Sequence, residues 1–96
     1  MPGWKFLSNH AQVLLCIAGD PGIRLRDIAV SVGITERASH RIVDDLVTSG
    51  YVSRERVGRR NRYTVLDHLP VHDPILQGRK LADLLTLIAG PAERKD

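Results

Sequence analysis

The spacing of small and apolar residues between positions 25 and 50 constrains the fold more than any other feature of the sequence. The first part of this stretch carries an apolar stripe at helical spacing, made of Leu25, Ile28, Ala29 and Val32. Gly33 follows at once and accepts the left-handed conformation that ends a helix. A small residue such as Ala29 shortly before a turn-forming glycine lets a second helix approach closely. The stretch is therefore typical of a helix-turn-helix.

The helix expected after this turn spans residues 35–49, with Thr35 as its cap. Plotted at about 100° per residue, its buried face comprises Ile42, Val43, Leu46 and Val47, with Ser39 at the centre. The opposite face points Arg37 and Arg41 outward, and His40 lies at its edge. This helix is therefore expected to bury one stripe and to present two arginines on the other side.

The periodicity then changes to that of a β-hairpin. Residues 51–57 and 62–66 are rich in β-branched and aromatic residues. Gly58 and Asn61 bracket a four-residue loop between these two segments. Arginine is concentrated here, at Arg54, Arg56, Arg59, Arg60 and Arg62. The hairpin is therefore expected to form a basic patch.

A further helix is expected before the helix-turn-helix, capped by Ser8 or Asn9 and running to about Ala18. The segment Gly-Asp-Pro-Gly at residues 19–22 stops it. The apolar residues at helical spacing in this helix are Ala11, Leu14, Leu15 and Ala18. Residues 23–25 are expected to add a very short strand before the next helix.

The C-terminal part is expected to form a connector and one more helix. Proline residues within and after residues 67–73 favour an extended connector. Asp73 is expected to cap the last helix, which ends at Gly90 and Pro91. The apolar residues of this helix are Ile75, Leu76, Leu81, Leu84, Leu85 and Ile88.

A last helix with this many apolar residues is difficult to bury within one chain of this size, which favours a symmetric homodimer. The expected dimer interface comprises Trp4, Phe6, Leu81, Leu84, Leu85 and Ile88. The alternative for Trp4 and Phe6 is that they cover the core of their own chain. The alternative for the helix is that it folds back onto the same core.

Taken in order, these elements predict a mostly α fold with a small β-hairpin, of the α+β class. The order of helices, turn and hairpin is that of a winged helix-turn-helix, here with a C-terminal dimerisation helix. Residues 1–66 form the expected DNA-binding domain, and residues 67–96 form the connector and last helix within the same compact unit. A chain of 96 residues has room for one such core.

Residues 8–66 resemble the winged-helix regulators of the MarR and ArsR type. The resemblance rests on residues 25–29, 33–35, 41–43, Leu46 and 50–52, and on the wing at residues 58–63. It implies a homodimer whose third helices enter successive major grooves, while the wings touch the minor groove or the backbone. Ser39 stands where such motifs usually carry valine or isoleucine, so the helices are expected to pack more closely there. The chain is also short for a MarR-type regulator and lacks additional dimerisation helices, so no ligand pocket of that kind is expected.

The residue types fit binding to duplex DNA as well. The formal net charge is +3, and most basic residues are arginine, which suits bidentate contacts with guanine and phosphate. The expected DNA-binding residues are Thr35, Arg37, Ala38, His40, Arg41, Arg59, Arg60 and Arg62. Asp44 and Asp45 would repel phosphate, so the contacts are expected in the first two turns of the helix.

Other classes of function find little support in the sequence. Phosphate-binding glycine loops, nucleophile elbows and zinc-protease motifs do not occur, so we expect no enzyme and no cofactor. His68, His72 and Asp73 do not have the spacing of a structural zinc site, so no metal is expected. The single cysteine and the absence of an apolar run of membrane-spanning length favour a cytoplasmic protein.

The sequence therefore predicts a sequence-specific DNA-binding transcription regulator, with the helix at 35–49 in the major groove and the wing at 57–62 beside it. The partners expected are double-stranded DNA and a second copy of the chain, and no small-molecule effector is indicated. An alternative is a winged helix that serves as a protein-interaction module within a larger assembly. Binding to structured RNA is a third possibility.

Overall fold

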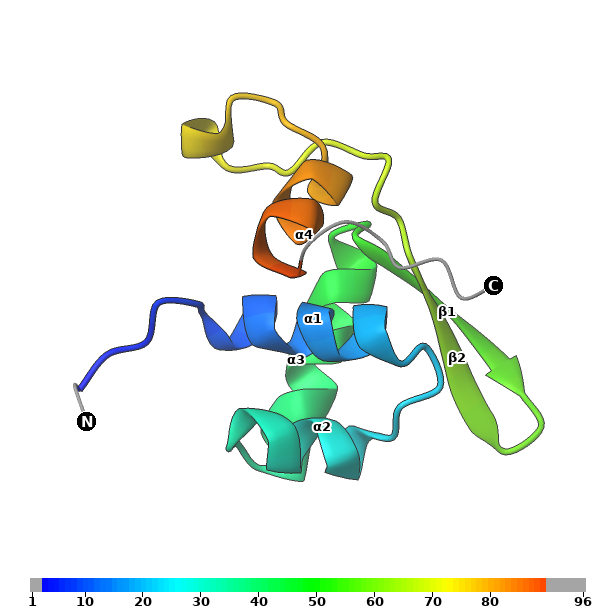
Figure 1. Cartoon of the computed structure of the whole chain (residues 1–96). Coiled ribbons are helices and arrows are strands. Elements are labelled where there is room, and N and C mark those ends of the chain that lie inside the picture. The colour runs from blue at the N-terminus through cyan, green and yellow to red at the C-terminus, as the bar shows by residue number, and fades with distance from the viewer. Residues whose placement is uncertain (1–2, 90–96) are drawn as a thin grey trace. The chain divides into compact units, whose positions relative to one another are not determined.

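The computed structural model describes residues 3–89, and the chain divides into two units, Met1–Val65 and Leu66–Asp96. The first unit contains three helices and one antiparallel hairpin (Figure 1), namely α1 (Asn9–Gly19), α2 (Leu25–Val32), α3 (Glu36–Thr48), β1 (Val52–Val57) and β2 (Arg60–Val65). This arrangement confirms the predicted mostly α fold with a winged helix-turn-helix order. That the two units form one compact body remains a prediction.

The helix-turn-helix follows the predicted pattern closely. Ala29 is 7% exposed between α2 and α3, so its small side chain lies where the two helices meet. Gly33 adopts the left-handed conformation, with φ of 82°. The amides of Gly33 and Ile34 both donate to the Ala29 carbonyl, at 2.8 and 3.0 Å. The turn therefore provides hydrogen-bond donors for a carbonyl at the end of α2 and sets the direction of α3.

Helix α3 is capped by Thr35, whose hydroxyl accepts from the Ala38 amide at 3.0 Å. Ser39 is fully buried on the inner face, as predicted. Its Oγ donates to the Thr35 carbonyl at 3.3 Å, so this buried hydroxyl is satisfied within the helix. The remaining buried residues of α3 are Ile42, Val43 and Leu46.

The predicted buried face of α1 was wrong in part. Ala18 is exposed and Ala11 and Leu15 are half-buried, whereas Val13 and Ile17 are completely buried. Nearly every residue from 11 to 18 is apolar, so the spacing of apolar residues does not single out one face. The buried residues of α1 are Val13, Leu14 and Ile17.

The hairpin turn is shorter than predicted. Its register pairs Val57 with Arg60, so the loop contains only Gly58 and Arg59, and Asn61 belongs to β2. Gly58 has φ of 63°, which suits the first central position of a two-residue hairpin turn. The predicted four-residue loop was therefore wrong, because strand pairing continues for two more residues on the β2 side.

The short strand predicted at residues 23–25 does not form. Ile23 and Arg24 belong to no strand, although the backbone of Arg24 is extended, and Leu25 already begins α2. Instead, a single backbone bond joins the Tyr63 amide to the Pro21 carbonyl at 2.9 Å. The hairpin is therefore a two-stranded sheet that touches the loop before α2 at one point of its backbone.

The second unit is more folded than the predicted extended connector. Backbone bonds from Leu81 to Leu69 and from Ala82 to Asp67, both 2.8 Å, fold the connector back onto the start of α4 (Leu81–Ala89). Asp73 is a cap, as predicted, and accepts from the Ile75 amide at 3.2 Å.

The cap at Asp73, however, starts only the 3-10 helix η1 (Pro74–Leu76). Gln77 and Gly78 have positive φ, at 51° and 79°, and this left-handed pair ends η1 before α4 begins. The predicted continuous last helix was therefore wrong in its start. Its predicted end at Gly90 and Pro91 lies outside the described residues.

Candidate nucleic-acid interface

The outward face of α3 carries the predicted pair of arginines. Arg37 and Arg41 are exposed and lie one helical turn apart. Neither side chain makes a hydrogen bond or ion pair with any residue that the structure describes. His40 is exposed beside them, and Ala38 is half-buried. The first two turns of α3 therefore present two uncommitted guanidinium groups next to a small apolar residue.

The backbone amides at the start of α3 already have one hydrogen-bond partner and one negative charge nearby. Thr35 is exposed, but its hydroxyl oxygen caps the helix through the Ala38 amide. Glu36 places a carboxylate in the first turn, close to the positive end of the helix dipole. An anion approaching this end would meet a capped amide and a negative charge, which makes the arginine pair the stronger feature of α3.

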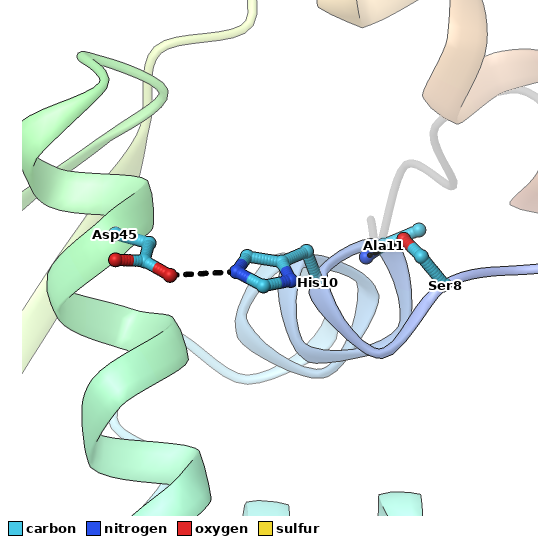
Figure 2. A network of polar contacts seen from close by, with 4 residues as sticks. All are labelled: Ser8, His10, Ala11 and Asp45. Carbon is cyan, nitrogen blue, oxygen red and sulfur yellow. Dashed lines mark hydrogen bonds and ion pairs between the residues drawn. The ribbon is translucent and has the colours of Figure 1, made fainter.

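The two aspartates of α3, Asp44 and Asp45, have basic partners. Asp45 Oδ2 lies 2.8 Å from His10 Nε2, and Figure 2 shows this contact reaching from α1 across to α3. Asp44 Oδ1 accepts from Arg54 Nη1 at 3.0 Å, and its Oδ2 lies 3.7 Å from His40 Nε2. These are exposed surface pairs, worth about 0–1 kcal/mol each. Their main effect is to offset negative charge beside the arginine pair and to direct Arg54 toward α3.

The three predicted wing residues lie in different environments. Arg59 is exposed in the hairpin turn and has no hydrogen bond or ion pair within residues 3–89. Arg60 is tied down, because its Nη2 donates to the Gly22 carbonyl at 2.6 Å. Arg62 is exposed in β2, opposite Glu55 in the register. Arg59 is therefore the guanidinium at the tip of the wing, and Arg60 connects the wing to the loop before α2.

Sequence reasoning missed Arg24 and Arg26 as part of the basic surface. Together with the wing they line a groove of about 440 Å³, whose lining residues are Gly22, Ile23, Arg24, Leu25, Arg26, Glu36, Arg59, Arg60, Asn61 and Tyr63. The available signal was the pair of arginines on either side of Leu25, at the start of the helix-turn-helix. No local sequence pattern shows that the wing lies beside these two arginines.

The predicted dimer residues are unevenly exposed. Trp4 and Phe6 are 64% and 91% exposed, and their rings meet edge to face with centroids 5.3 Å apart. Leu81, by contrast, is only 2% exposed. Leu84 and Leu85 are half-buried and Ile88 is exposed. The exposed aromatic pair is therefore the larger apolar surface of this set, and its contact with a second copy remains a prediction.

Residues 3–89 bring no three His, Cys, Asp or Glu side chains together in a way that would hold a metal ion. None of the described helices has the length and apolar character needed to span a membrane. Burial raises the pKa of the Cys16 thiol, and a hydrogen bond with Ser31 opposes this effect. A raised pKa disfavours the reactive thiolate, so Cys16 has the character of a packing residue.

A comparison with protein-family models matches residues 6–62 to the MarR family. The matched segment runs from just before α1 through the helix-turn-helix and the hairpin turn into β2. It thus includes the arginine pair of α3 and the wing arginines. No curated protein matches the chain.

Proposed function

The chain belongs to the MarR family, and from this premise we propose that it is a sequence-specific regulator of transcription that binds duplex DNA. In this proposal α3 enters the major groove, and the wing at residues 57–62 lies on the minor groove or the backbone. Proteins of this family are regulators and not enzymes, and the chain is proposed to act in the same way.

The observation that carries the proposal is the free arginine pair of α3. Arg37 and Arg41 lie on the outer side of a helix whose inner side is held by a buried core. The major groove admits an α-helix and presents a distinct pattern of donors and acceptors for each base pair. Arginine donors one turn apart on a fixed helix match that pattern, with guanine edges as the preferred contacts.

The neighbours of this pair support the same orientation. Ala38 can contact a thymine methyl group, and His40 can donate to or accept from a base edge. Thr35 is proposed to lie near the DNA backbone as well, although its hydroxyl oxygen already accepts from the Ala38 amide and Glu36 adds a negative charge there. Because His10 and Arg54 pair with the two aspartates farther along α3, the repulsion of the DNA backbone by these carboxylates is reduced.

The wing supplies the less specific part of the proposed interface. Arg59 is exposed at the tip, and Arg62 is exposed along β2. Exposed guanidinium groups bind phosphate with little dependence on sequence and also favour a narrow minor groove. The wing is thus proposed to add affinity, while α3 selects the site.

A homodimer is the proposed assembly. Two copies related by a two-fold axis would place two α3 helices about one turn of DNA apart, near 34–36 Å. The preferred site would then be an inverted repeat. The exposed Trp4 and Phe6 are proposed to lie in the interface between copies.

Selection from a pool of random duplexes tests the proposal. The expected result is enrichment of an inverted repeat whose half-sites lie about 10 base pairs apart. Arg37→Ala with Arg41→Ala should lose the enriched motif while keeping the fold, since both side chains are exposed. Failure of the parent protein to enrich any duplex would overturn the proposal and favour a protein-interaction module.

A further inference from the structure

The groove between the wing and the start of α2 has the chemistry of a phosphate site. Its lining includes four arginines, Arg24, Arg26, Arg59 and Arg60, against a single carboxylate, that of Glu36. The sequence separates these arginines into two groups more than thirty residues apart. The fold therefore gathers positive charge at one place, which costs electrostatic repulsion unless an anion joins it.

Three of these guanidinium groups are available to a ligand. Arg24, Arg26 and Arg59 are exposed, and none of them has a hydrogen bond or ion pair with another residue in the described ranges. Guanidinium donors arranged around a groove suit the oxygens of a phosphate, which accept bidentate hydrogen bonds. Glu36 leaves the site with a net positive charge, since it balances only one of the arginines.

The fourth arginine holds the two sides of the groove together. Arg60 Nη2 donates to the Gly22 carbonyl at 2.6 Å, and the Tyr63 amide donates to Pro21 nearby. These two contacts join β2 to the loop that leads into α2. They fix the distance between Arg59 on the wing and the two arginines at the start of α2 in the free protein. Arg60 is thus a positioning residue, while the other three face the ligand.

We propose that this groove binds a phosphate group of the DNA backbone, held from the α2 side by Arg24 and Arg26 and from the wing side by Arg59. The inference rests on the proposed DNA-binding function and extends it to two residues outside α3 and the wing. DNA is chosen as the source because the groove lies open beside the wing and the first turn of α3, through Arg59 and Glu36, and so adjoins the proposed interface.

The test compares the salt dependence of DNA binding in matched variants. Arg24→Gln with Arg26→Gln removes two charges from the groove, and Arg79→Gln with Lys80→Gln removes two exposed charges from the second unit as a control. Loss of one phosphate contact should make the slope of log affinity against log salt shallower by about 0.9 per half-site. Between 50 and 200 mM salt this corresponds to about a three- to fourfold smaller loss of affinity per half-site.

The outcomes separate this inference from the proposed function. A shallower slope for the groove variant, with the control like the parent, supports the phosphate site. A groove variant that matches both the parent and the control overturns the inference, while the steep binding of the parent leaves the proposed function intact. A parent that binds no duplex at any salt concentration overturns the proposed function itself. Melting curves of all variants establish that each is folded.

A second arm identifies the source of the phosphate. Inorganic phosphate is titrated at constant ionic strength, and the amide signals of residues 22–26 and 58–61 are followed by NMR. Weak shifts that do not saturate, together with the changed DNA slope, support the backbone assignment. Saturation at submillimolar phosphate with an unchanged DNA slope would assign the groove to a free phosphorylated ligand and overturn the proposal.

Discussion

The outer face of α3 and the hairpin both carry exposed arginines, but the two elements differ in how much of each is buried. Arg37 and Arg41 project from a helix with four buried residues on its inner side. Arg59 projects from a two-stranded hairpin in which Val52 is the single buried residue of β1. A side chain on a packed helix keeps a fixed geometry, as bidentate hydrogen bonds require, whereas one at a hairpin tip mainly supplies charge. The comparison agrees with the proposed division of roles, in which α3 supplies specificity and the wing supplies affinity.

The largest effect on DNA binding is expected from Arg41→Ala. If this variant did not lose affinity for the selected site, the division of roles between α3 and the wing would be wrong. Loss of a bidentate base contact should weaken the selected site by about 1–3 kcal/mol, and binding to random duplex should fall much less. Competition of the selected duplex against random duplex measures the ratio directly. An equal loss on both duplexes would show that Arg41 contacts only phosphate and that α3 does not read sequence.

The next effect is expected from the double wing variant Arg59→Ala with Arg60→Ala. Its affinity should fall on all duplexes alike, and its salt slope should become shallower by about 1–2. Anisotropy titrations across a salt series give both quantities. A variant that binds like the parent would remove the wing from the interface, and a change in preferred sequence would contradict the division between the two regions.

A smaller effect, on amide hydrogen exchange in the free protein, distinguishes the role of Arg59 from that of Arg60. Arg60→Gln removes the contact with the Gly22 carbonyl, so the amides of Gly22 and Ile23 should exchange faster with solvent. Arg59→Gln should leave this exchange unchanged, since Arg59 has no such contact within the described chain. Hydrogen exchange followed by NMR measures both. Equal exchange in the two variants would show that Arg60 does not position the wing.

Glycine substitutions compare how firmly the two regions are built. Gly33→Ala and Gly58→Ala each force alanine into a left-handed conformation, with φ of 82° and 63° and no atom close to the added methyl group. Each should cost about 1–2 kcal/mol through this strain. For Gly33→Ala the loss should appear in full as a lower free energy of unfolding in urea. For Gly58→Ala part of it should appear as local opening of the hairpin, and equal global losses would contradict the view of the wing as the looser element.

The smallest effect is expected from Asp45→Asn. It removes the carboxylate that contacts His10 Nε2, and the free energy of unfolding should fall by less than about 1 kcal/mol. Binding to random duplex should become slightly stronger, because a negative charge beside the interface is lost. Asp67→Asn, in the second unit, serves as the control of equal charge. Weaker DNA binding by Asp45→Asn would indicate that the His10 contact orients α3.

The sequence predicted the part of the fold that local patterns determine. Ala29, Gly33 and Ser39 could be placed because helical spacing, a turn glycine and the angular position on a helix are properties of neighbouring residues. The exposed positions of Arg37 and Arg41 followed from the same argument. The turn before α3, the start of the helix and its outer face were therefore correct. The predicted buried face was correct except for Val47, which is only half-buried.

The remaining features depend on contacts between distant residues. The register that places Asn61 in β2 is set by pairing along the whole hairpin, and the contact of Arg60 with Gly22 spans 38 positions. The pairing of His10 with Asp45 spans 35 positions. Neither spacing nor composition contains this information. The basic groove and the basic partners of the two aspartates of α3 could therefore be found only from the three-dimensional structure.

The most direct test of the account is the fluorescence anisotropy of a labelled mixed-sequence duplex, titrated with the parent protein across a salt series. The account predicts binding that weakens steeply as salt rises, because several arginines displace counterions from the DNA. It also predicts a clearly shallower slope for Arg59→Ala with Arg60→Ala under the same conditions. Absence of binding at the lowest salt concentration would contradict the central claim that the exposed arginines of α3 and the wing form an interface for duplex DNA.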